Sequence, residues 1–280
     1  MPANTEAFNK KVAIITGASS GIGAATARKL ALGGLRVVLV ARRQERLASL
    51  ADEIQRQGGQ AYVIAADLAQ EAGRMSVYEQ VSARYGALDV LVNNAGLGWY
   101  GYCADMPWAT AQEILKVNIE AVVQLTMLFL PGMRERDSGH IINIGSIVGS
   151  LASQGVALYS ASKSFLDTFT TSLYRELANS QVRVSVVRAG PVTSEFFQTA
   201  ASRPSGSPIP AERFGIEPEV VAGRVWSLLH KPHRVVYVPG WLRVAPWIEF
   251  FFGWFEDRLG PFLLRNRALT RLVTGKRRGY

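Results

Sequence analysis

Short apolar runs rich in β-branched residues alternate with segments of helical periodicity along most of this 280-residue chain. Runs of this kind are typical of strands buried on both faces of a parallel sheet. They lie at 11–16, 36–40, 62–65, 88–92, 140–144, 182–187 and 234–238. The segments between them predict helices at 22–32, 43–57, 74–85, 110–135, 157–179 and 217–230. Such alternation predicts an α/β fold with right-handed crossovers and helices on both faces of a doubly wound sheet.

The predicted elements define the domain organisation. About seven strands and six helices leave no room for a second domain before residue 240, so residues 1–240 predict one Rossmann-type domain for catalysis and cofactor binding. The longest irregular stretch, 194–215, contains three prolines. A loop of that length is usually functional, and we expect a substrate lid there, with a surface insertion as the alternative. Residues 241–280 form an aromatic and basic C-terminal extension.

Cysteine and histidine usage excludes several classes of protein. The single cysteine, Cys103, excludes a disulfide scaffold within the chain and a thiolate metal cluster. His140, His230 and His233 lack the spacing of metal ligands, so we expect no metal site. The N-terminal residues have no apolar core of a secretory signal, and we expect a cytoplasmic protein.

A glycine-rich turn follows the first predicted strand and opens the first predicted helix. Residues 16–23 read T-G-A-S-S-G-I-G. Glycines let the backbone approach a pyrophosphate, and the helix N-terminus supplies N–H donors and a positive dipole. The place of the turn between strand and helix predicts a nucleotide site rather than a tight turn without a ligand. The expected contacts are Gly17, Ser19, Ser20, Gly21, Ile22 and Gly23.

The end of the second predicted strand bears on which nicotinamide cofactor is bound. NAD sites place a carboxylate there to accept hydrogen bonds from the ribose diol. This chain has Arg42 and Arg43 instead. An arginine pairs with a 2′-phosphate through bidentate hydrogen bonds, so we expect NADP(H), with Arg42 as the main contact and Ser19 or Arg43 assisting. The alternative is that both arginines are solvated residues at the start of a helix.

Three side chains have the spacing of a proton-transfer site. Tyr159 and Lys163 lie four residues apart on one face of a predicted helix, and Ser146 ends the fifth predicted strand. A tyrosine with its ordinary pKa of about 10 exchanges protons poorly at neutral pH. A nearby ammonium group and an oxidised nicotinamide both favour the phenolate, while a serine hydroxyl could hold the substrate oxygen.

These motifs, in this order, resemble the short-chain dehydrogenase/reductase family over residues 10–240. T-G-x-x-x-G-I-G, N-N-A-G at 93–96 and the Ser146–Tyr159–Lys163 spacing carry the resemblance. It implies that Asn118 completes a catalytic tetrad by holding a proton-relay water. It also implies cofactor contacts at Asp67, Leu68, Asn94, Ala95, Gly96, Tyr159, Lys163, Gly190, Val192 and Ser194. Ala189 and Ser194 depart mildly from the usual proline and threonine of the family.

The resemblance implies hydride transfer between nicotinamide C4 and a carbonyl carbon, with Tyr159 as general acid or base and Ser146 stabilising the developing charge. Residues placed near the reaction centre are mainly apolar, so we expect a hydrophobic ketone, aldehyde or secondary alcohol. The expected substrate pocket comprises Trp99, Ile147, Val148, Val156, Phe196 and Phe197. The resemblance further implies a homodimer or homotetramer built on the helices at 110–135 and 157–179.

The net charge of +9 is concentrated in the extension. Residues 258–280 contain seven basic and no acidic side chains, against 24 basic and 22 acidic in the rest, so we expect no nucleic-acid binding. Residues 241–255 hold seven aromatics. On a helix from Trp247 the polar or small residues form one narrow stripe: Glu249, Gly253, Glu256, Asp257 and Gly260. Aromatics followed by cations suit a peripheral membrane contact, with pocket cover, subunit contact or a solvated basic end as alternatives.

Two readings from other classes stay open. The chain could be a non-catalytic NADP(H)-binding sensor, or a membrane-surface scaffold of the same fold. The presence of Asn118, Ser146, Tyr159 and Lys163 together favours an enzyme, because a protein that only binds its cofactor has no need of groups for proton transfer.

Overall fold

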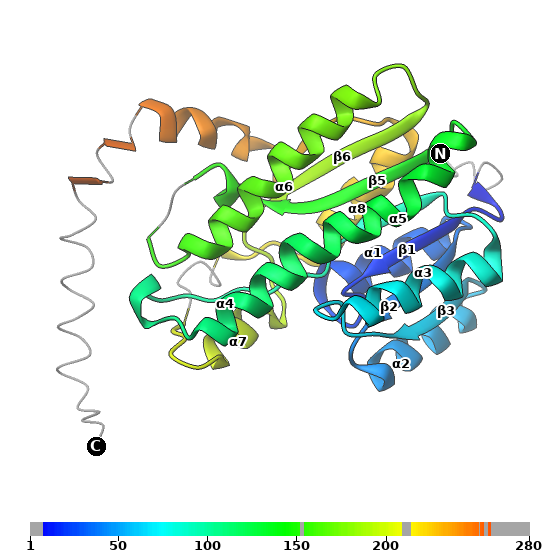
Figure 1. Ribbon diagram of the computed structural model, residues 1–280, viewed down its shortest axis with the longest axis horizontal. Helices are drawn as coiled ribbons and strands as arrows, with labels where there is room; N and C mark the ends of the chain where they lie inside the picture. Colours follow the sequence, from blue (N-terminus) through cyan, green and yellow to red (C-terminus); the bar gives the residue numbers. More distant parts are fainter. Residues whose placement is uncertain (1–7, 152–153, 209–213, 252, 255–256, 259–280) are drawn as a thin grey trace.

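Seven parallel strands form one sheet in the order β3-β2-β1-β4-β5-β6-β7 (Figure 1). The computed structural model describes residues 8–151, 154–208, 214–251, 253–254 and 257–258. The strands are β1 (Val12–Thr16), β2 (Arg36–Ala41), β3 (Gln60–Ala65), β4 (Val90–Asn93), β5 (Gly139–Ser146), β6 (Val182–Ala189) and β7 (Val235–Val238). The doubly wound parallel sheet expected from the sequence is confirmed.

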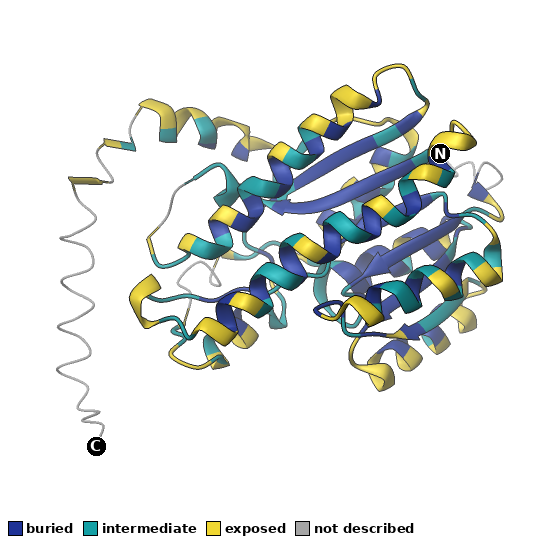
Figure 2. Cartoon of the chain, viewed as in Figure 1, coloured by how far each residue is buried: buried dark blue, intermediate teal, exposed yellow. Residues whose placement is uncertain are grey.

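Helices cover both faces of this sheet. One face carries α1 (Gly21–Leu32), α2 (Gln44–Arg56) and α8 (Pro218–His230). The other carries α3 (Glu71–Tyr85), α5 (Ala121–Glu135) and α6 (Ala157–Glu176). Each layer encloses its own apolar cluster, and the strands between them are buried while the outer helix faces are exposed (Figure 2). This burial on both sides explains why the strands read as continuous apolar runs.

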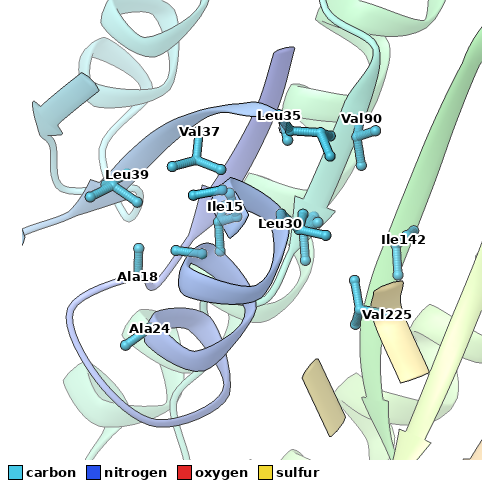
Figure 3. Packing of buried hydrophobic residues seen from close by; sticks show 14 of the residues in the cluster. Ile15, Ala18, Ala24, Leu30, Leu35, Val37, Leu39, Val90, Ile142 and Val225 are labelled. Atoms are coloured by element: carbon cyan, nitrogen blue, oxygen red, sulfur yellow. The ribbon is translucent and has the colours of Figure 1, made fainter. Parts of the chain in front are cut away.

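Packing around β1 illustrates the core. Ile15 of β1 and Leu30 of α1 are fully buried and belong to one cluster with Leu35, Val90 and Val225 (Figure 3). Burying side chains of this size contributes roughly 1.5–3 kcal/mol each to folding. The central strand is thereby held in one position, and the turn that leaves its carboxyl end is held with it.

The strand order places a crevice at the carboxyl ends of β1 and β4. The chain winds from β1 outward to β3 and then crosses back to β4, which pairs with β1 on its other side. The connections after β1 and β4 therefore leave in opposite directions. Ligands of open α/β sheets bind at such a switch point, beyond the carboxyl ends of the strands.

The predicted helix at 110–135 is interrupted in the structure. It consists of α4 (Trp108–Leu115), a π-helical turn η3 (Lys116–Glu120) and α5. The helix from Trp108 to Glu135 is long and apolar enough to span a membrane by length and composition, with 44% of its most apolar window buried. Its side chains Leu125, Phe129 and Met133 belong to the core cluster, so we assign it as a core helix.

The segment 194–215 is not irregular throughout, because α7 occupies Glu195–Ser202. The Ser194 hydroxyl caps this helix by accepting the Phe196 N–H at 3.4 Å, and Glu195 lies favourably in its first turn. Phe197 and Ala200 are its buried residues. The prolines fall after the helix, and residues 209–213 of the predicted lid lie outside the described residues.

The C-terminal extension leaves the sheet directly after β7. A 3₁₀ turn, η6 (Gly240–Val244), leads into helical residues from 245 onward. The expected start near Trp247 was therefore two residues late. Of the predicted polar stripe, Glu256 and Gly260 lie outside the described residues.

Candidate active site

A cavity of about 510 Å³ opens at the carboxyl ends of β1, β4, β5 and β6. It extends from the glycine-rich turn to the predicted catalytic residues. Predicted cofactor residues on its wall are Gly17, Ser19, Ser20, Gly21, Ile22, Arg42, Arg43, Asp67, Leu68, Asn94, Ala95, Gly96, Tyr159, Lys163, Gly190, Val192 and Ser194. Gly23 and Asn118 do not line it. The fold therefore brings together residues from six regions of the sequence.

The glycine-rich turn needs its glycines for two different reasons. Gly17 and Gly21 have φ angles of +66° and +52°, a conformation that other residues adopt only with strain. Gly23 is a packing glycine, since a Cβ there would lie 2.3 Å from the Gly17 carbonyl oxygen. Gly23 does not line the cavity, and its lack of a side chain allows the close packing of α1 against the turn, so its contact with a cofactor stays a prediction.

Thr16 ties the turn after β1 to the loop after β4. Its Oγ1 accepts the N–H groups of Asn94 and Ala95, each at 2.9 Å, and the Asn94 amide donates to the Thr16 carbonyl at 2.8 Å. The Asn94 side chain is therefore engaged in holding the two loops together. Sequence reasoning missed Thr16, although it heads the glycine motif.

The two arginines after β2 have different environments. Arg43 donates to Ser19 Oγ at 3.0 Å and Ser20 Oγ at 3.0 Å, which places its guanidinium against the glycine-rich turn. It also pairs with Glu195 of α7 at 2.7 Å. Arg42 pairs instead with Glu113 of α4 at 3.0 Å. Arg43 is therefore the arginine that contacts the glycine-rich turn. The sequence had predicted Arg42 as the main contact to a 2′-phosphate.

Tyr159 and Lys163 project from α6 into the cavity, and Ser146 faces them from the end of β5. Burial raises the pKa of Tyr159 to about 12, with a hydrogen bond from Ser146 acting in the opposite direction. The Lys163 ammonium lies 5.7 Å from the Tyr159 ring centroid and donates to the Ile144 carbonyl at 2.9 Å. Burial lowers the Lys163 pKa to about 8, opposed by Asp167. Burial thus moves the two pKa values apart, because it disfavours the charged form of both the phenol and the amine.

Asn118 lies behind this group, in the π-helical turn η3. Its Oδ1 accepts the Leu97 N–H at 2.8 Å, and its Nδ2 donates to Leu97 O and Ser162 Oγ, each at 3.0 Å. Ser162 in turn donates to the Tyr159 carbonyl at 2.7 Å. Asn118 thus connects the loop after β4 to α6. Ser162 was missed, although it lies three residues after Tyr159 on α6.

An ion pair between Asp167 and Arg188 lies next to Lys163. Asp167, one turn further along α6, accepts a hydrogen bond from Arg188 of β6 at 3.0 Å, and Arg188 also donates to Tyr237 of β7. Burial raises the pKa of Asp167 against the opposing effect of Arg188. Sequence reasoning missed this pair. Its signal was a carboxylate four residues after Lys163, on the same helical face.

The predicted substrate residues all line the cavity. The Phe196 ring of α7 lies 5.4 Å from the Tyr159 ring, so α7 packs over Tyr159. Trp99 is only 1% exposed, and its indole donates to the Pro204 carbonyl at 3.1 Å. Trp99 therefore also anchors the segment after α7. The remaining members are Ile147, Val148, Val156 and Phe197.

Comparison with known proteins assigns the family. The family model for short chain dehydrogenases matches residues 11–204. A short chain dehydrogenase of Pseudocercospora fijiensis is 38% identical over 190 residues, covering 66% of this chain and 60% of that protein. A ketoacyl reductase of Nostoc is 38% identical over 183 residues, covering 65% of this chain and 64% of that protein. The chain belongs to the short-chain dehydrogenase/reductase family.

Solved structures agree with this assignment. A metagenomic short-chain oxidoreductase in complex with NADP has a TM-score of 0.70 and 38% identity, covering 82% of this chain and 96% of that one. A short-chain dehydrogenase/reductase of Burkholderia phymatum in complex with NAD has a TM-score of 0.81 and 24% identity, covering 90% of this chain and 96% of that one. The second likeness concerns the fold alone.

Proposed function

We propose that the protein is an NADP(H)-dependent oxidoreductase that transfers hydride between nicotinamide and a hydrophobic ketone, aldehyde or secondary alcohol. The observation that carries the proposal is one continuous cavity with the glycine-rich turn at one end and Ser146, Tyr159 and Lys163 at the other. A nucleotide bound along this cavity would have its phosphates at the turn and its nicotinamide beside the tyrosine. The related oxidoreductase complexed with NADP supports the choice of cofactor.

The residues at the turn fit a nucleotide with a 2′-phosphate. Gly17 and Gly21 leave the backbone open to a pyrophosphate. Directly after β2 the cavity is lined by Arg42 and Arg43, where an NAD site would have a carboxylate. Arg43 is fixed by Ser19 and Ser20, which prepares it to bind an anion without a loss of side-chain freedom. We assign it as the main contact to the 2′-phosphate, with Arg42 assisting.

At the catalytic end the chain would supply proton transfer and orientation. When bound, the cofactor supplies or accepts the hydride. Tyr159 Oη would protonate the substrate oxygen in reduction and remove the hydroxyl proton in oxidation. Ser146 would donate a hydrogen bond to the same oxygen as charge develops on it. The Lys163 ammonium would lower the pKa of Tyr159 from the high value that burial imposes. Asn118 would keep the loop after β4 and α6 in register and is a positioning residue in this proposal.

The walls next to Tyr159 favour an apolar substrate. Ile147, Val148 and Val156 line the same cavity, as do Phe196 and Phe197 of α7. Apolar pockets of this kind discriminate by shape and by burial of hydrocarbon. Since α7 covers the catalytic tyrosine, we propose that residues 194–215 act as the substrate lid.

The same helices that frame the site provide an apolar outer surface. Met127 of α5 is 66% exposed, and the half-buried rings of Phe165 and Phe169 on α6 are stacked 5.6 Å apart. We propose that α5 and α6 form the contact of a homodimer or homotetramer. A cytoplasmic location, which suits the one free thiol at Cys103, stays part of the proposal.

Oxidation of NADPH with a panel of hydrophobic ketones and aldehydes tests the function. Tyr159→Phe should lower turnover by about 100-fold or more and leave NADPH affinity unchanged, because only the proton-transfer group is lost. Tyr102→Phe, at an exposed tyrosine outside the cavity, is the matched control and should keep full turnover. Equal turnover of wild type and Tyr159→Phe would contradict the assigned role. NADPH binding without turnover on any substrate would favour the sensor.

A further inference from the structure

The helical segment after β7 presents its large apolar side chains to solvent. Its most exposed members are Trp241, Trp247, Ile248, Phe250, Phe251 and Trp254, each between 53% and 77% exposed. The Phe251 ring contacts both Trp247 and Phe250, with ring centroids 6.2 Å and 5.0 Å apart. They form one aromatic surface, which we call the aromatic face.

Four other described residues of the segment are less exposed. Leu242 and Ala245 are buried, and Glu249 and Gly253 are half-buried. A helix on the surface of a globular protein normally buries its apolar side and exposes its polar side. In the part of the segment that the structure describes, six large apolar side chains are exposed while Glu249 is half-buried. An exposed apolar surface of this size indicates a partner that is itself apolar.

The segment is attached at the rim of the substrate cavity. Leu242 and Ala245 pack with Ile147 in a small cluster that also includes Val148 and Leu151. Ile147 and Val148 line the cavity as well. The segment that carries the aromatic face is therefore anchored, through Leu242 and Ala245, on side chains that also line the cavity.

Charge distinguishes between two possible apolar partners of the aromatic face, a second copy of the chain and a lipid bilayer. Arg243 is exposed within the segment, and residues 258–280 add seven basic side chains and no acidic one. Self-association through the aromatic face would pair two copies of a strongly basic segment, which is electrostatically unfavourable. A bilayer with anionic lipids would accept the aromatic rings at its interface and attract the cations.

We propose that the aromatic face lies in the interface of an anionic lipid bilayer, with the following basic residues on the headgroups and the apolar end of the cavity at the membrane surface. Glu249 and the acidic pair at 256 and 257 in the same segment are incompatible with a membrane span. The substrate class then follows, provided that the proposed function holds: a lipophilic carbonyl compound or alcohol that partitions into the bilayer and enters the cavity from that side.

Co-sedimentation of the full chain with vesicles tests this proposal. Phosphatidylcholine vesicles that contain phosphatidylserine should bind the protein, while pure phosphatidylcholine vesicles should bind it at least about tenfold more weakly. Trp247→Ser should weaken binding several-fold and the triple change Trp247→Ser, Phe250→Ser, Phe251→Ser by about tenfold or more. Trp108→Ser, at an equally exposed tryptophan on α4, is the matched control and should bind as wild type does.

NADPH titration of the same samples separates this proposal from the proposed function. The triple variant should bind NADPH as wild type does, because none of its substitutions lines the cavity. Equal sedimentation of wild type and the triple variant would overturn the lipid contact, as would equal binding to both kinds of vesicle. A smaller particle mass in the triple variant, without lipid binding by wild type, would instead assign the aromatic face to a second copy of the chain.

Discussion

Glu195, the first residue of α7, forms an ion pair at 2.7 Å with Arg43, which lies two residues after the end of β2. Arg46 of α2 pairs with the same carboxylate at 2.6 Å. The helix that covers Tyr159 is thus linked to the arginine that we assign to the 2′-phosphate. A phosphate that binds the Arg43 guanidinium must either share that guanidinium with Glu195 or displace the Glu195 carboxylate from it.

Removing the charge of Glu195 should therefore favour NADPH. In Glu195→Gln the guanidinium of Arg43 no longer has a competing carboxylate, and the 2′-phosphate no longer meets a nearby negative charge. We expect NADPH affinity to rise by about two- to fivefold, the range for partly exposed ion pairs, and NADH affinity to stay unchanged. Fluorescence titration with both cofactors measures this. Glu45→Gln, at an exposed carboxylate on α2, is the control, and an equal gain for NADH would contradict the explanation.

The Asp167–Arg188 pair behind Lys163 should be important for folding. Arg188→Met leaves the Asp167 carboxylate buried without its partner, and we expect a loss of about 3–5 kcal/mol in the free energy of unfolding, measured in urea. Asp167→Asn in the same chain should recover part of the loss, because a neutral amide does not need a cation. If Arg188→Met alone is as stable as wild type, the pair does not stabilise this region.

Buried His140 gives the protein a pH-dependent stability. It shares a 2.8 Å hydrogen bond with Ser185, and burial lowers its pKa to about 3. In the unfolded chain the imidazole titrates near 6.5, so below that pH the unfolded state binds a proton that the folded state does not. This contribution is present in full above pH 6.5 and is lost as the pH falls towards 3.

Urea unfolding between about pH 7.5 and 5 tests this, with an expected decrease of about 1.4 kcal/mol per pH unit below 6.5 from His140 alone. His140→Asn should flatten this dependence. His233→Gln, at an exposed histidine, should leave it unchanged. The same pH dependence in all three proteins would assign the effect to other groups.

The sheet and most of the site could be predicted because their signals are local. Ser146 ends β5 and Tyr159 and Lys163 begin α6, as expected, since strand runs and i, i+4 spacing depend on neighbours along the chain. The confirmed family assignment agrees with the order of the motifs. The particular roles of these residues remain proposals.

What the sequence did not reveal depends on contacts between distant elements. The relative position of Arg42 and Arg43 follows from Glu113 on α4 and Glu195 on α7, more than 70 residues away. Helix α7 was read as loop because its cap, Ser194, precedes a segment with several prolines. Gly23 was predicted to contact the cofactor because it belongs to the glycine-rich motif. Its close approach to the Gly17 carbonyl depends on the path of the turn, which the motif alone does not describe.

Binding of the two nicotinamide cofactors tests the central claim most directly. Titration of the full chain with NADPH and NADH, followed by cofactor fluorescence, should give tighter binding of NADPH. Arg43→Ala should remove most of that preference, and Arg42→Ala a smaller part of it, while NADH affinity changes little in either variant. Equal or tighter binding of NADH by wild type would contradict the assignment of the arginines. Binding of neither cofactor would contradict the proposed function as a whole.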